Sequence, residues 1–152
     1  MLIIHKKIKK GNKLDIKKII VASAGPLTNL IIIIITYNLK IDMIKAIMVI
    51  YTNFLIMIFN LLPIYPLDGG RILSGILHII VGKQKADDAI NSISMISTIL
   101  ITAIASVLIL YLKNIAIFLI VMYLWYLVLK ESNRYLRRKK YIMKILENKT
   151  NK

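Results

Sequence analysis

The segment NLLPIYPLDGGR, residues 60–71, joins the residue types of a rigid turn to a carboxylate, directly after an apolar run. Its two prolines stop a regular helix, because proline has no backbone N–H and its ring clashes with the preceding turn. Its two glycines allow backbone angles closed to other residues, or the close approach of another chain. The candidate site residues of this segment are Asn60, Pro63, Pro66, Asp68, Gly69 and Gly70.

Asp68 is the residue of this segment that could do chemistry. An ionisable group at membrane depth costs about 2.5–3.5 kcal/mol on insertion scales, so it marks a functional site by default. Irregular backbone near the membrane is tolerated where it is buried in protein or lines a wet cavity. The alternative is an ordinary exit turn at the cytoplasmic surface, with Asp68 solvated and paired with Arg71. The residues alone leave both interpretations open.

A second segment, ASAGPLTN at residues 22–29, places a proline inside an apolar run. Gly25 and Pro26 in a helix interior remove a backbone hydrogen bond and predict a kink. The small residues before Pro26 allow another helix to approach closely. Asn29 adds an amide at membrane depth. A kinked packing helix with one interhelical hydrogen bond would explain this motif equally well.

Both segments lie in a chain with the composition of a membrane protein. Apolar residues make up 58% of it, against roughly 45–50% in soluble proteins. A helix needs about 20 apolar residues to cross the hydrocarbon. The sequence predicts an all-α integral membrane fold with about four transmembrane helices, an unwound Pro/Asp-Gly-Gly segment and a short interfacial helix. The predicted spans are Ile19–Leu39, Met43–Leu62, Ile93–Leu112 and Ile115–Leu129, and the short helix is Ile72–Val81.

The net charge of +15 arises from 22 basic and 7 acidic residues. Nucleic acid is not the predicted partner, because the basic residues gather in residues 5–18 and 134–144, at the two ends of the apolar region. Lys and Arg are retained on the cytoplasmic side of membranes. We therefore expect a multi-pass protein of the cell membrane with both termini in the cytoplasm, and residues 40–42 and 113–114 outside.

Two parts of unequal size follow from this pattern. Residues 1–130 are expected to form a membrane-embedded domain, and residues 131–152 a basic cytoplasmic tail. The tail is basic and amphipathic, a composition that binds anionic lipid of the bilayer surface.

The remaining polar residues have simpler interpretations. The chain has no cysteine, so a metal would need N or O ligands. His78 is expected to be a packed or interfacial histidine, and His5 a solvated one among lysines. Asp87 and Asp88 precede the third span and are expected to cap its N-terminus, where carboxylates complement the helix dipole.

AGPLTN followed by NLLPIYPLDGG in adjacent spans resembles the site-2 protease (peptidase M50) family of intramembrane zinc metalloproteases. The sequences of the two motifs are most similar to those of the stage IV sporulation protein FB branch, and the resemblance covers residues 13–71. The two segments match the family patterns A-G-P-x-x-N and N-x-x-P-x-x-P-x-D-G.

The resemblance implies a zinc metalloendopeptidase. The family holds Zn²⁺ with the two histidines of an HExxH helix and the aspartate of the D-G motif, a role that falls on Asp68. The prolines and glycines would unwind the helix and turn this carboxylate inward. Asn29 and Asn60 match the motif asparagines and would support the substrate or the unwound backbone. Substrates would be membrane-associated or transmembrane segments cut near the cytoplasmic face, under the control of a regulatory membrane partner, with a sporulation sigma-factor precursor as the example from the closest branch.

This sequence departs from the family pattern in one respect: it contains no HExxH. His5 and His78 are its only histidines, and they lack the i, i+4 spacing that puts two imidazoles on one helix face. In the family that helix precedes the A-G-P segment, so the sequence corresponds to the C-terminal part of the catalytic core, with no catalytic residue of its own. We expect it to be inactive alone. Two alternatives stay open: a pseudoprotease that binds membrane substrates without cutting, and a small transport protein that uses Asp68 in a broken helix.

Overall fold

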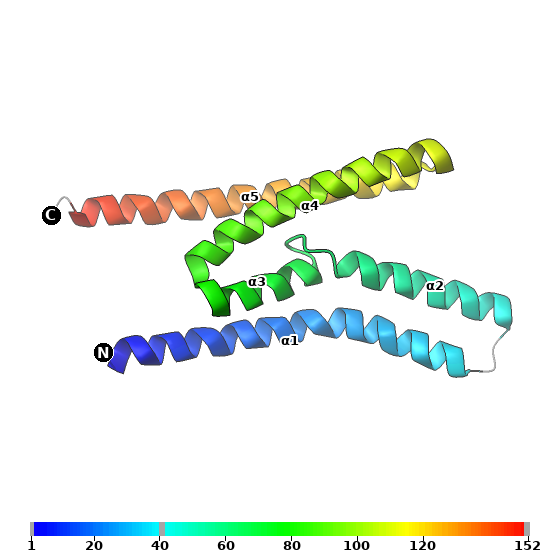
Figure 1. The fold of residues 1–152 in the computed structure, drawn as a ribbon, viewed down its shortest axis with the longest axis horizontal. Coiled ribbons are helices and arrows are strands. Elements are labelled where there is room, and N and C mark those ends of the chain that lie inside the picture. The colour runs from blue at the N-terminus through cyan, green and yellow to red at the C-terminus, as the bar shows by residue number, and fades with distance from the viewer. Residues whose placement is uncertain (1, 40–41, 151–152) are drawn as a thin grey trace. The chain divides into compact units, whose positions relative to one another are not determined.

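The computed structural model describes residues 2–39 and 42–150 of the chain, with side chains described for residues 13–39, 42–145 and 147–148. Every regular element in these ranges is a helix, as Figure 1 shows. In chain order the elements are α1 (Leu2–Asn38), α2 (Met43–Asn60), α3 (Asp68–Val81), α4 (Lys83–Leu112) and α5 (Ile115–Thr150).

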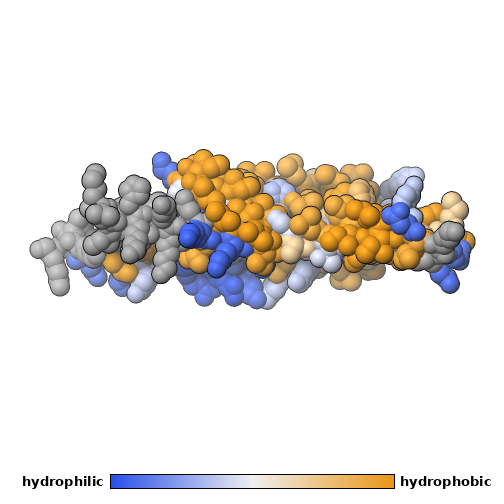
Figure 2. Space-filling model, turned by 90° about the horizontal axis from the view of Figure 1, so that it is seen from below, coloured by the Kyte–Doolittle hydropathy of each residue, from blue (hydrophilic) through white to orange (hydrophobic). Residues whose placement is uncertain are grey.

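Four of these helices are long and apolar enough to cross a membrane: α1 from Lys13 onward, α2, α4, and α5 as far as Ile145. The fifth, α3, has 14 residues, which at a rise of 1.5 Å gives roughly 21 Å, less than the hydrocarbon core of about 30 Å. In Figure 2 hydrophobic residues form broad areas of the visible face, and hydrophilic residues gather in smaller groups beside them. The predicted fold class, four candidate spans with one short helix, is confirmed.

The helices extend beyond the apolar runs that predicted them. The basic N-terminal segment belongs to α1, which begins at Leu2 rather than Ile19, and the basic tail continues α5 without interruption to Thr150. Lys, Arg, Leu and Ile are compatible with helix and no proline interrupts either extension, so the helix continues where the hydropathy falls. The expected boundary between residues 130 and 131 therefore lies inside one helix, and its role as the limit of a membrane domain stays a prediction.

The expected capping role of Asp87 and Asp88 is wrong. Helix α4 begins at Lys83, directly after Gly82, whose φ of 82° lies in the left-handed region. The N–H of Ala86 donates to the carbonyl of Gly82 at 3.0 Å, so the residue before the helix is Gly82, five residues ahead of Asp87. Both carboxylates consequently lie in the second turn of the helix.

The chain forms two compact units, residues 1–90 and 91–152. In the first unit α2 and α3 both pack on α1. Figure 1 shows α2 returning beside the later part of α1 and α3 continuing beside its earlier part. Together α2 and α3 amount to one broken helix that runs antiparallel to α1.

In the second unit, α5 lies beside the part of α4 that follows Asn91. The indole N–H of Trp125 on α5 donates to the hydroxyl of Thr102 on α4 at 3.0 Å. Between the helices, Lys113 has a φ of 48° and the side chain of Asn114 accepts from the N–H of Ala116 at 2.9 Å, as an N-cap does.

Residues 113–114, one of the two predicted outer loops, therefore form a tight turn between α4 and α5. The other predicted outer loop, residues 40–42, lies largely outside the described residues. The side of the membrane on which either loop and the termini lie stays a prediction, which labelling of an introduced cysteine would check.

Candidate functional site

The break between α2 and α3 is an ordered turn. The N–H of Ile64 donates to the carbonyl of Leu62, and the N–H of Leu67 donates to the carbonyl of Ile64, both at 2.7 Å. The peptide bond before Pro66 is cis. The side chain of Ile64 is fully buried. Because the backbone between the helices has hydrogen bonds of its own, the prolines end α2 without leaving a loose loop.

Two glycines let α3 begin against this turn. A Cβ atom on Gly69 would overlap the carbonyl groups of Leu61 and Leu62, and one on Gly70 would overlap the backbone of Ile64 and Tyr65. These neighbours are backbone atoms, which cannot rotate aside as a side chain can. Of the two predicted reasons for the glycine pair, special backbone angles or close approach, the structure shows close approach, and the approaching backbone is the preceding turn of the same chain.

Asp68 is the first residue of α3. A carboxylate in the first turn of a helix complements the positive end of the dipole. A Cβ atom on Gly25 would lie 2.6 Å from Oδ2 of Asp68, so this carboxylate occupies the space left by the missing side chain of Gly25. The two sequence motifs, far apart in the chain, meet at this contact.

The alternative interpretation of Asp68 as a solvated group paired with Arg71 is not what the structure shows. Asp68 is half-buried and Arg71 is exposed. The ion pairs between described side chains include none between these two residues. The carboxylate turns toward α1 rather than toward the cation that follows it in the chain.

The motif on α1 bends a helix without ending it. Helix α1 is continuous through Pro26, and Figure 1 shows its axis changing direction along its length. The hydroxyl of Ser23 donates to the carbonyl of Ile19 and that of Thr28 to the carbonyl of Ala24, both at 2.8 Å. Such back-bonding is common where helices bend.

The two motif asparagines lie on α1 and at the end of α2. Asn29 lies one turn after Gly25 on α1, so the two residues share a helix face. Asn60 is the last residue of α2. Both side chains are half-buried. These positions are compatible with support of the broken backbone, a role that stays a prediction.

The described residues do not fit a zinc ion by themselves. No group of three or more His, Cys, Asp or Glu side chains in the described part of the chain could hold a metal. Zinc in proteins takes four ligands, three of them from protein in catalytic sites. Asp68 offers one, and His78 lies at a different place on α3 with both ring nitrogens engaged.

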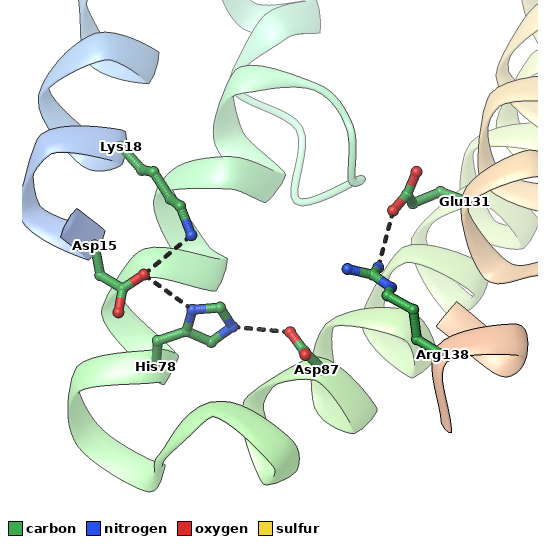
Figure 3. A network of polar contacts seen from close by, with 6 residues as sticks. All are labelled: Asp15, Lys18, His78, Asp87, Glu131 and Arg138. Atoms are coloured by element: carbon green, nitrogen blue, oxygen red, sulfur yellow. Dashed lines mark hydrogen bonds and ion pairs between the residues drawn. The ribbon is translucent and has the colours of Figure 1, made fainter. Parts of the chain in front are cut away.

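Sequence reasoning missed a polar cluster on the same unit. His78 of α3 contacts Asp15 of α1 and Asp87 of α4, and Lys18 contacts Asp15, as Figure 3 shows. The sequence predicted a packed or interfacial His78, and the structure shows a packed one, with 7% of the side chain exposed. The available signal was Asp15, the single acid within the basic residues 5–18.

Comparison with known proteins bears on this site at the level of a family. No curated protein and no solved structure matches the chain. A sequence model does match: that of Peptidase family M50, over residues 38–104. The matched range begins after Asn29 and so omits the A-G-P motif. It contains the whole segment from Asn60 to Arg71 and extends beyond the expected limit at Arg71, so the turn that presents Asp68 lies inside the part of this chain that resembles Peptidase family M50.

Proposed function

We propose that this chain carries the D-G part of an intramembrane zinc metalloprotease of the site-2 protease type. The observation that carries the proposal is the half-buried Asp68 carboxylate, which begins α3 at a break between apolar helices and occupies the space beside Gly25. A surface turn would not need a glycine on a neighbouring helix to accommodate its carboxylate. The match to Peptidase family M50 across this turn supports the same conclusion.

The role of Asp68 in this proposal is to supply one carboxylate ligand. The histidine ligands and the glutamate base of the family pattern are not residues of this sequence, which contains no HExxH. They would come from another segment, and no proton transfer or nucleophilic step is assigned to this chain. Its contribution is positional: the turn and the two glycines hold Asp68 at a fixed point between apolar helices.

The proposed substrates are membrane-associated or transmembrane segments cut near the cytoplasmic face. A sporulation sigma-factor precursor is the specific candidate from the most similar branch, and a regulatory membrane protein is the expected partner. The basic end of α5, where Arg137, Lys140 and Lys144 are exposed, would meet anionic lipid if the termini are cytoplasmic.

A second candidate, a pseudoprotease that binds membrane substrates without cutting them, is favoured by one observation. Three ligands are needed for a catalytic zinc, and the described residues supply one of them. Transport has weaker support. The hydroxyls of Thr98, Thr102 and Ser106 donate to carbonyls of their own helix at 2.7–2.8 Å, so these groups are already hydrogen-bonded.

The proposal is tested by supplying the chain with the HExxH helix that its sequence does not contain. An HExxH-bearing membrane segment of the family is fused upstream or supplied separately, and cleavage of a membrane-tethered reporter is measured together with zinc stoichiometry. We expect no cleavage by the unsupplemented chain and measurable cleavage by the completed one. Asp68→Asn keeps the side-chain shape but removes the charge that helps to hold a dication, so cleavage should largely vanish.

Asp42→Asn is the matched control. Asp42 is exposed, precedes α2 and makes no side-chain cap hydrogen bond, so its loss should change neither cleavage nor zinc content. Full activity of Asp68→Asn in the completed enzyme would show that the site is assigned to the wrong residue. A completed chain that binds the reporter equally well with and without zinc, and never cuts it, would favour the pseudoprotease.

A further inference from the structure

His78 lies between two carboxylates that come from different helices. Its Nδ1 is 3.2 Å from Oδ1 of Asp15 on α1, and its Nε2 is 2.8 Å from Oδ1 of Asp87 on α4 (Figure 3). Asp15 precedes His78 by 63 residues and Asp87 follows it by 9. One imidazole therefore connects α3 to the helix before it and to the helix after it.

The two contacts of His78 restrict which ring nitrogens can carry protons. An ionised carboxylate can only accept hydrogen bonds, and a neutral imidazole carries one donor and one acceptor. With both carboxylates ionised, the two contacts are satisfied at once only when both ring nitrogens carry a proton. With Lys18 on Asp15 at 3.2 Å, the cluster then contains two positive and two negative groups and is neutral overall.

Burial makes this arrangement consequential. The side chain of His78 is 7% exposed, that of Asp15 15% and that of Asp87 31%, whereas Lys18 is 61% exposed. Charge-assisted hydrogen bonds are stronger than neutral ones, and removal of one member of a buried pair leaves the other charge uncompensated. The three inner groups therefore depend on one another.

Helix α3 meets α1 at three successive places. Asp68 lies beside Gly25 at its first residue. A Cβ atom on Gly75 would lie 2.5 Å from Cγ1 of Ile19 in its middle. His78 contacts Asp15 near its end. The first two contacts depend on glycine and permit close approach, whereas the third is a directional attraction that can hold the helix in place.

We propose that the doubly protonated His78, held between Asp15 and Asp87, is a lock that fixes α3 on α1 and on the first turns of α4. By fixing α3 the lock keeps Asp68 beside Gly25. The lock itself follows from the contacts of the cluster, and only the use of Asp68 as a ligand rests on the proposed function. His78 is thus a positioning residue and takes no part in the chemistry.

The first experiment reads the proton directly. His5 is the only other histidine, so ¹⁵N-histidine labelling of the His5→Gln protein in micelles leaves the signals of His78 alone. We expect the pattern of a ring protonated on both nitrogens at neutral pH, and conversion to a neutral tautomer in Asp15→Asn/Asp87→Asn. A neutral ring in the protein with both aspartates present would overturn the proposal.

The second experiment reads the position of α3. The chain has no cysteine, so spin labels can be placed uniquely at Val21 on α1 and Ile80 on α3, each 71% exposed. We expect one narrow distance distribution between the labels. His78→Ala should broaden or shift it most, because it removes the contact between the two helices. The isosteric Asp15→Asn should do so next, because it removes the charge of that contact.

Asp42→Asn is again the control and should leave the distribution unchanged. An unchanged distribution in both His78→Ala and Asp15→Asn would overturn the lock. If His78→Ala does not fold, Asp15→Asn and the histidine spectra still decide. Neither readout involves zinc or cleavage. A lock that passes both tests, in a completed enzyme whose activity does not need Asp68, would therefore leave the lock standing and reject the proposed function.

Discussion

Prolines occupy two places in this chain with opposite results. Pro26 lies inside α1, which continues on both sides of it for a total of 37 residues. Pro63 and Pro66 lie where α2 ends and α3 begins. The residue that breaks helices is the same, so the difference arises from what else is available to satisfy the freed backbone groups.

In α1 a single proline removes one N–H, and the helix can bend around the loss. At the break, two prolines are followed by two glycines, and the turn supplies hydrogen bonds from Ile64 and Leu67 to replace those of a helix. Because lipid offers no hydrogen bonds, backbone leaves the helix only where such replacements exist. A proline in an apolar run therefore predicts a bend, and a proline pair with glycines predicts an end.

The largest expected effect comes from adding a side chain to Gly69 at the break between α2 and α3. Gly69→Val puts a branched side chain where Leu61 and Leu62 present their carbonyl groups, so α3 can no longer start against the turn. Overpacking of this kind costs about 1–3 kcal/mol and occasionally more. The measurement is the thermal midpoint and the monodisperse fraction in detergent. Ala103→Val, at an exposed position of α4, is the control, and an equal response of both variants would show that the close approach at Gly69 is unimportant.

An intermediate effect is expected at the contact between Gly25 of α1 and Asp68 of α3. Gly25→Leu would drive the Asp68 carboxylate away from α1, since even a Cβ atom would lie 2.6 Å from Oδ2. We expect a lower folded yield in membranes, with a destabilisation on the order of 1–3 kcal/mol. Ile33→Leu on the same helix keeps the side-chain volume and should cost less than about 1.5 kcal/mol. Equal yields of the two variants would contradict the contact between Gly25 and Asp68.

The smallest effect is expected from removing the bend. Pro26→Ala restores an N–H that can donate to the carbonyl of Ala22, which gains a hydrogen bond, but it straightens a helix whose neighbours fit the bent form. The two changes oppose each other, so we expect a net change within about 1 kcal/mol. The check is the same thermal midpoint, with the Val21 to Ile80 label distance as a second readout. A loss of fold would show that the bend, and not only the glycine, positions the site.

Much of this architecture could be predicted because it depends on local sequence. Hydropathy located four candidate spans, and the residue types of segment 60–71 predicted the break and gave close approach as one of two reasons for Gly69 and Gly70. Helix ends were less predictable. Charged residues end an apolar run without ending a helix, which is why α1 and α5 exceed their predicted spans and why Asp87 lies inside α4 rather than at its start.

The contacts that join the helices could not be predicted. Nothing in the sequence pairs Gly25 with Asp68, because their approach depends on how α1 and α3 pack. The same holds for His78 and Asp15, which are 63 residues apart. Each of these residues has an ordinary local explanation, as a packing glycine, a buried histidine or an acid among lysines. The cluster becomes visible only when three helices are in place.

The close contacts of Gly69 and Gly70 with the turn remove a degree of freedom from α3. A helix packed only through side chains can slide along its neighbour, but a shift of α3 by one residue, about 1.5 Å, would press its backbone into the carbonyl of Leu61 or pull it off the turn. Translation of α3 along α1 is therefore blocked by the turn, and the position of Asp68 along α1 is set by steric exclusion.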